Sequence, residues 1–146
     1  MNPMRIRNNQ KGVTLLESLL GILLFSVGIL AVVGMQAMAV RNVAESKYRM
    51  DASFLANQII GEMWVNRTNL ASYAYTGGTP PAVATTWVTH VANTLPGTTT
   101  TLNPPLINIS GNTVTITLRW QHPEEARMNP PPPPHNHQVI ASIDCC

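Results

Sequence analysis

Three histidines and two cysteines towards the C-terminal end are the side chains best suited to binding a metal. They are His122, His135, His137, Cys145 and Cys146. Imidazole nitrogens and thiolates are the usual Zn²⁺ ligands, and common zinc sites place them at characteristic short spacings. The spacing of these five residues fits no common zinc site. The sequence therefore predicts no metal site, and no bound cofactor is expected.

The rest of the chain contains no arrangement typical of an enzyme active site. It has no glycine-rich phosphate loop and no Ser-His-Asp or paired-carboxylate pattern. The adjacent Glu124 and Glu125 are interpreted as a solvated loop pair, and His90 as an exposed helix residue. The vicinal Cys145 and Cys146 cannot join distant segments, which leaves a strained ring, an intermolecular bridge or free thiols open. We expect a protein without enzymatic activity.

Two residues near the N-terminus stand out because they precede a long apolar stretch. Gly12 comes directly after the basic Lys11, and Glu17 lies just before residues 18–40, which are 23 residues without a charged side chain. About 20 consecutive apolar residues are enough to cross a bilayer. We therefore expect a membrane-spanning helix with a carboxylate near its start. A secretory signal peptide cleaved after the run, at the Ala-Met-Ala of residues 37–39, is the alternative.

The carboxylate of Glu17 needs a partner if it enters the membrane. An acidic side chain at mid-bilayer costs roughly 2.5–3.5 kcal/mol, and a buried charge is tolerated when it is paired. Cleavage after Gly12 would place the new α-amino group of Val13 one helical turn from Glu17. In a helical bundle, Glu17 could instead reach the terminus of a neighbouring subunit. The other interpretation is an interfacial Glu17 that faces lipid headgroups.

Residues 11–18, with the sequence KGVTLLES, and the uncharged stretch after them resemble the cleavage motif of type IV prepilins and type II secretion pseudopilins. The resemblance implies that prepilin peptidase, a membrane-embedded aspartic peptidase, cuts after Gly12 and methylates Val13. It also implies that Glu17 helps subunits to dock. Val13 stands where Phe is commoner in that family. The implied location is the inner membrane, with the head in the periplasm, and then the pilus. Three Lys or Arg residues precede the span and three follow closely, at positions 41, 47 and 49, so the positive-inside rule does not decide the orientation.

One long helix must carry these residues. No proline interrupts residues 13–67, and the pattern changes after residue 40 from uniformly apolar to amphipathic. Spacings of three and four predict a buried face. Its residues are Val40, Ala44, Tyr48, Leu55, Ile59 and Met63, flanked by Val43, Phe54, Ile60 and Trp64. A helix of about 55 residues would be roughly 80 Å long.

The remainder predicts a small head with an α+β fold. A short helix led by Trp87 ends at Pro96 and Gly97, and residues 113–120 alternate as a strand should. Further strands are expected at residues 106–109 and 139–143. The resulting domains are a basic leader (1–12), a transmembrane and assembly half of the helix (13–40), its amphipathic half (41–68) and the head (69–146). This is a pilin-like plan, with a long N-terminal helix packed on a small antiparallel sheet.

The head carries a second resemblance. The short helix led by Trp87 and the strand that ends in Arg119 and Trp120 are similar to the PilV branch of minor pilins. Major pilins usually have two separated cysteines that bracket a C-terminal loop, and this chain lacks them. The resemblance therefore implies a minor rather than a major subunit.

Charge and proline content limit the other possibilities. The net charge is +2, but removing residues 1–12 lowers the number of Lys and Arg from nine to six against seven acidic residues, a net charge of −1. No nucleic-acid partner is therefore expected. Residues 130–134 are all proline and predict a stiff polyproline II loop between the last two strands.

These observations favour a structural subunit: a minor pilin of a type IV pilus that primes or supports assembly. Its expected partners are other major and minor pilins, prepilin peptidase, the inner membrane and the pilus assembly machinery. The alternatives are a type II secretion pseudopilin, a pilus-tip binding or adhesion module that acts through the proline loop, and a single-pass membrane protein that is never cut after Gly12.

Overall fold

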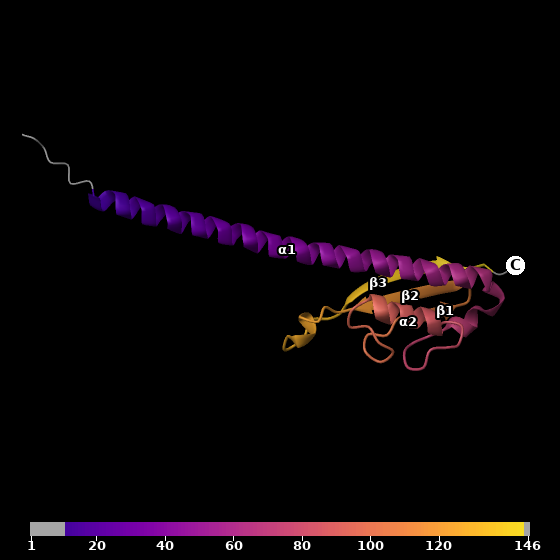
Figure 1. The fold of residues 1–146 in the computed structure, drawn as a ribbon. Coiled ribbons are helices and arrows are strands. Elements are labelled where there is room, and N and C mark those ends of the chain that lie inside the picture. Colours follow the sequence, from indigo (N-terminus) through magenta and orange to yellow (C-terminus); the bar gives the residue numbers. More distant parts are fainter. Residues whose placement is uncertain (1–10, 145–146) are drawn as a thin grey trace, which may run out of the picture. The chain divides into compact units, whose positions relative to one another are not determined.

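The computed structural model describes residues 11–144, with side chains from Val13 onward. The chain divides into two compact units, residues 1–44 and residues 45–146. The element order is α1 (Lys11–Val65), η1 (Arg67–Tyr73), α2 (Thr85–Thr94), β1 (Leu106–Ser110), β2 (Thr113–Trp120), η2 (Glu125–Arg127) and β3 (His135–Ser142) (Figure 1). The predicted α+β, pilin-like fold is confirmed.

The part of α1 in the first unit is apolar on all sides. Every side chain from residue 13 to residue 43 is exposed, and its large hydrophobic side chains are 48–71% exposed. An 18-residue window of this helix has a mean hydropathy of 2.5, which makes it long and apolar enough to cross a membrane. No side chain of residues 13–144 covers this surface, and exposed apolar surface of this extent is typical of a site for lipid or for another protein.

The part of α1 in the second unit buries a narrow stripe against the head. Its buried residues recur at helical spacing: Ala52, Leu55, Ala56, Ile59 and Met63. The predicted positions Leu55, Ile59 and Met63 are thus confirmed. The prediction is wrong at Val40 and Val43, which belong to the first unit and are 69% and 68% exposed. It is also wrong at the flanks Phe54 and Trp64, which are 66% and 44% exposed. Each lies one residue, and so about 100° of helix rotation, from the centre of the stripe.

The head sheet is antiparallel with the strand order β1-β2-β3. Val114, Ile116, Leu118 and Trp120 of β2 are fully buried, as their alternation predicts. They form one core with the buried stripe of α1 and with Trp87, Val88 and Val91 of α2. The indole Nε1 of Trp87 donates a hydrogen bond to the carbonyl oxygen of Leu55 at 2.8 Å, which ties α2 to α1.

Residues 121–134 connect β2 to β3 and contain the expected proline run, together with η2, which was not predicted. Two hydrogen bonds tie the start of this connection to the head and to the proline run. The Gln121 amide N–H donates to the Pro96 carbonyl at 2.9 Å, and the Gln121 side chain donates to the Pro132 carbonyl at 2.9 Å. The neighbouring Gly97 has a φ of +68°, and a Cβ there would lie 2.8 Å from the Gln121 carbonyl oxygen. Glycine is therefore required at position 97 by both its φ and its surroundings.

Candidate functional site

The sequence-predicted processing and assembly residues lie at the start of α1. Gly12 is in its first turn, but its surroundings and residues 1–10 of the expected leader lie outside the described residues. Val13 is 66% exposed, and Glu17 is exposed one turn further on. The structure therefore leaves both described residues accessible to a neighbouring molecule.

Polar side chains in the apolar part of α1 differ in whether they have partners. The hydroxyl of Ser18 donates to the Thr14 carbonyl at 2.9 Å, and that of Ser26 donates to the Ile22 carbonyl at 2.7 Å. Such bonds satisfy these hydroxyls within the helix, as a membrane environment requires. Within residues 13–144, by contrast, the Glu17 carboxylate has no hydrogen bond or ion pair. Any hydrogen-bond or ion-pair partner of this carboxylate would therefore come from outside this part of the chain.

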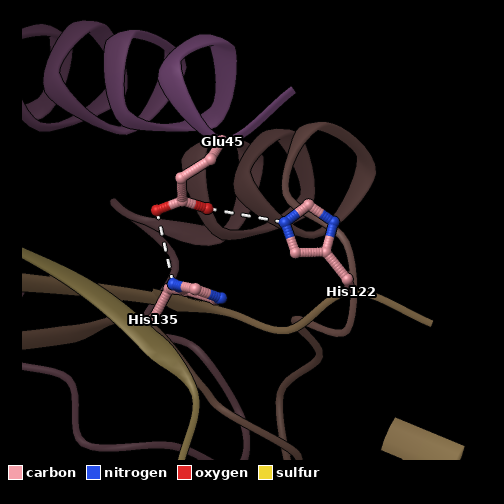
Figure 2. Close-up of side chains that lie close together, drawn as sticks. All are labelled: Glu45, His122 and His135. Carbon is pink, nitrogen blue, oxygen red and sulfur yellow. Dashed lines mark hydrogen bonds and ion pairs between the residues drawn. The ribbon is translucent and has the colours of Figure 1, made fainter. Parts of the chain in front are cut away.

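A second polar site lies in the unit of residues 45–146, where Glu45 of α1 meets His122 and His135 (Figure 2). The Oε1 of Glu45 accepts a hydrogen bond from the Arg49 Nε at 2.9 Å and lies 3.3 Å from the Nδ1 of His135. The Oε2 of Glu45 lies 3.3 Å from the Trp120 Nε1 and 3.4 Å from the His122 Nε2. Both carboxylate oxygens are thus surrounded by nitrogen atoms.

This environment stabilises the carboxylate form of Glu45. Partial burial works against ionisation, but hydrogen bonds from Trp120, Arg49 and His122 and the charge of His135 outweigh it. Together they hold the pKa of Glu45 below its ordinary value of 4.5. The surrounding groups therefore favour the charged form of Glu45.

The imidazole of His135 lies between two carboxylates. Its Nδ1 faces Glu45, and its Nε2 lies 3.2 Å from both carboxylate oxygens of Glu125. The backbone N–H of His122 also donates to Glu125, at 3.2 Å. Burial raises the pKa of Glu125, but the hydrogen bonds from His135 and from the His122 backbone outweigh this and leave the pKa below 4.5.

Aromatic rings fix the orientation of the two imidazoles. Trp120 and His135 are directly paired between β2 and β3, and their rings stack at 5.9 Å between centroids with an interplanar angle of 14°. The ring of Tyr48 meets that of His122 edge to face at 5.3 Å. The side chains of Glu45, His122 and His135 remain 23%, 25% and 29% exposed, so solvent reaches all three.

Sequence reasoning missed this arrangement. It did not single out Glu45 and interpreted Glu125 as half of a solvated pair, whereas Glu125 is half-buried and bonded to His135. His122 and His135 were considered as ligands and set aside because of their spacing. The available signal was the pairing of the last two strands, which brings the residues at both ends of their connection together. The last strand was expected only at residues 139–143, whereas β3 begins at His135 and pairs it with Trp120.

Of the other metal-binding candidates, the described His137 does not join this cluster. His137 lies two residues further along β3, where its Nε2 is buried without a hydrogen-bond partner in the described part of the chain. Cys145 and Cys146 lie outside the described residues. His90 is exposed on α2, as expected.

The fold and the N-terminal site define a class: a protein with one exposed apolar helix able to cross a membrane, continued into a small α+β head. Comparison with protein families makes the class more specific. Residues 7–33 match the prokaryotic N-terminal methylation motif, which indicates a type IV pilin-like or pseudopilin protein. No curated protein and no solved structure matches the chain significantly.

Proposed function

We propose that this protein is a minor pilin of the PilV type that primes or supports assembly of a type IV pilus. The observation that carries the proposal is the methylation motif over residues 7–33 at the start of a helix whose apolar surface is exposed from residue 13 to residue 43. A head that folds on a separate stripe of the same helix leaves this surface available for other subunits.

Processing would occur at the junction of Gly12 and Val13. Residues 1–12 would be the leader, removed by prepilin peptidase at the inner membrane, and Val13 would carry the methyl group. The precursor would have residues 13–40 in the membrane and residues 41–68 as the amphipathic half of the helix. The head, residues 69–146, would lie in the periplasm until the subunit enters the pilus.

Glu17 would act in assembly rather than in folding of the head. Its carboxylate has no partner within residues 13–144, and it lies one turn from Val13. A charge in an apolar surrounding is strongly favoured to pair. The α-amino group of Val13 in a neighbouring pilin supplies the opposite charge, so docking of two subunits would neutralise both.

The N-terminal mass of the protein recovered from membranes tests the proposal first. In cells that express prepilin peptidase, we expect a chain that starts at Val13 and carries one extra methyl group. Gly12→Leu should leave the leader attached, whereas Gly21→Leu, in the same helix and with open space around its Cβ position, should be processed normally. An intact leader in the wild type, or a cut after Ala39, would refute the proposal.

Deletion of the gene distinguishes a minor pilin from a type II secretion pseudopilin, which the same motif also fits. Loss of surface pili with normal protein secretion is expected. Loss of secretion with normal pili would assign the chain to the secretion machine. Deleting residues 130–134, which leaves β3 complete, should leave piliation intact only if the proline loop serves binding rather than assembly.

A further inference from the structure

We propose that Glu45, His122 and His135 form a Zn²⁺-binding site in the head, with Glu125 orienting His135. The three ligands come from α1, from the connection after β2 and from the first residue of β3. One ligand atom from each lies within 4.8 Å of the others. All three belong to the unit of residues 45–146.

The distances fit a tetrahedral ion. Zn–N and Zn–O bonds of about 2.0–2.2 Å place neighbouring ligand atoms roughly 3.3–3.6 Å apart. The Glu45 Oε2 lies 3.4 Å from the His122 Nε2, and the Glu45 Oε1 lies 3.3 Å from the His135 Nδ1. Because these distances end on different oxygen atoms, small rotations of the partly exposed side chains must bring one oxygen and both nitrogens to the tetrahedral spacing. The fourth position is left for water.

The surroundings have the form of an outer ligand shell. A metal-bound histidine usually donates its other N–H to a carboxylate, which fixes the ring and its tautomer. His135 is placed this way: when its Nδ1 faces the metal, its Nε2 faces Glu125 at 3.2 Å. Glu45 is likewise held by N–H groups of Arg49 and Trp120. Hydrogen bonds of this kind also hold ligating carboxylates in metal sites.

The ligand set selects the metal. Two imidazoles and one carboxylate suit Zn²⁺ and its neighbours in the first transition row. Ca²⁺ and Mg²⁺ prefer sites made of oxygen atoms alone. A bound Zn²⁺ would join α1 to both ends of the connection between β2 and β3, and so would hold the proline run in place.

The experiment measures Zn²⁺ binding to the metal-stripped, full-length protein in detergent by calorimetry, and Co²⁺ binding by absorption. We expect one equivalent of Zn²⁺, a rise in the unfolding temperature of the head, and a tetrahedral Co²⁺ spectrum without sulfur-to-metal bands. Glu45→Gln and the double variant His122→Ala/His135→Ala should lose binding. Glu125→Gln should bind roughly 10–100-fold more weakly, because it leaves all three ligands in place.

Two controls make the result specific. His90→Ala removes an exposed histidine outside the cluster, and Cys145→Ser/Cys146→Ser removes the thiols. Both variants should bind Zn²⁺ as the wild type does. Wild-type affinity no higher than that of the His122→Ala/His135→Ala variant would overturn the proposal, as would loss of binding in the cysteine variant. If a ligand variant fails to fold, the Co²⁺ spectrum of the wild type and the affinity of Glu125→Gln still decide the question.

Discussion

Replacing Gly97 with alanine should destabilise the head more than any other Gly→Ala change at a comparable backbone angle. Gly97 has a φ of +68°, and its added Cβ would lie 2.8 Å from the carbonyl oxygen of Gln121. Gly111, in the turn between β1 and β2, has a φ of +59° and nothing within 4 Å of its Cβ position. The pair therefore separates the cost of the backbone angle from the cost of the contact.

The magnitude follows from these two terms. A left-handed backbone costs an alanine about 1–2 kcal/mol, which is the whole effect expected for Gly111→Ala. Gly97→Ala adds the overlap with Gln121, whose backbone and side chain are each held by a hydrogen bond of 2.9 Å. Overpacking of this kind costs typically about 1–3 kcal/mol. We expect a total of about 2–5 kcal/mol for Gly97→Ala.

Urea unfolding of the full-length protein in mild detergent, followed by tryptophan fluorescence, measures both variants. Trp87 and Trp120 are 2% and 0% exposed, so their emission reports the head core. The slope of the free energy of unfolding against urea should stay unchanged while the midpoint falls. Equal losses in Gly97→Ala and Gly111→Ala would refute the reasoning, because the close contact would then carry no cost.

Three further predictions test other parts of the molecule. Glu17→Gln should reduce incorporation of the protein into pili at least about tenfold, since a loss of about 1.4 kcal/mol in docking free energy has that effect. The urea midpoint of the head should stay unchanged. Normal incorporation into pili would contradict the assembly role. Burial raises the pKa of Tyr75 above its ordinary value of 10.0, so its contribution to stability is complete below pH 10 and is lost as the pH rises through the raised pKa. The hydroxyl of Tyr75 donates to the Gly78 carbonyl, so the free energy of unfolding of the wild type should exceed that of Tyr75→Phe by about 1 kcal/mol. This difference should shrink above pH 10, and a difference that stays constant would refute the reasoning. Ile116→Val in the fully buried centre of β2 should cost about 0.5–1.5 kcal/mol by urea unfolding, whereas Ile140→Val on the exposed face of β3, where Ile140 is 65% exposed, should cost less.

The fold could be predicted from sequence because its elements have clear periods. The alternation in β2 placed Val114, Ile116, Leu118 and Trp120 in the core, and they are all fully buried. The uninterrupted helix was predicted from the absence of proline and the change in pattern near residue 40. Periodicity shows the centre of a buried face but not its width, which depends on how much of α1 the head covers. For this reason Phe54 and Trp64 were wrongly expected to pack.

The Glu45 cluster could not be predicted from local pattern. Glu45 and His122 are separated by 77 residues, and nothing in the sequence near Glu45 distinguishes it from the other charges of the helix. Their proximity depends on the register of α1 on the sheet, which the packing of Leu55 and Ile59 sets. The half of the cluster that spans β2 and β3 could more readily have been predicted, since Trp120 pairs with His135. The N-terminal residues were the opposite case, because the motif around Gly12 and Glu17 is local and was recognised without any structure.

The hydrogen bond from Trp87 to the Leu55 carbonyl has a mechanical consequence. Successive carbonyl oxygens of a helix point about 100° apart around its axis. Turning α1 by a single residue within residues 45–65 would therefore carry the Leu55 oxygen out of reach of the indole, which is itself fixed in the core. The bond therefore opposes rotation of residues 45–65 relative to the head core, so a torque applied to this part of the helix would turn the head with it.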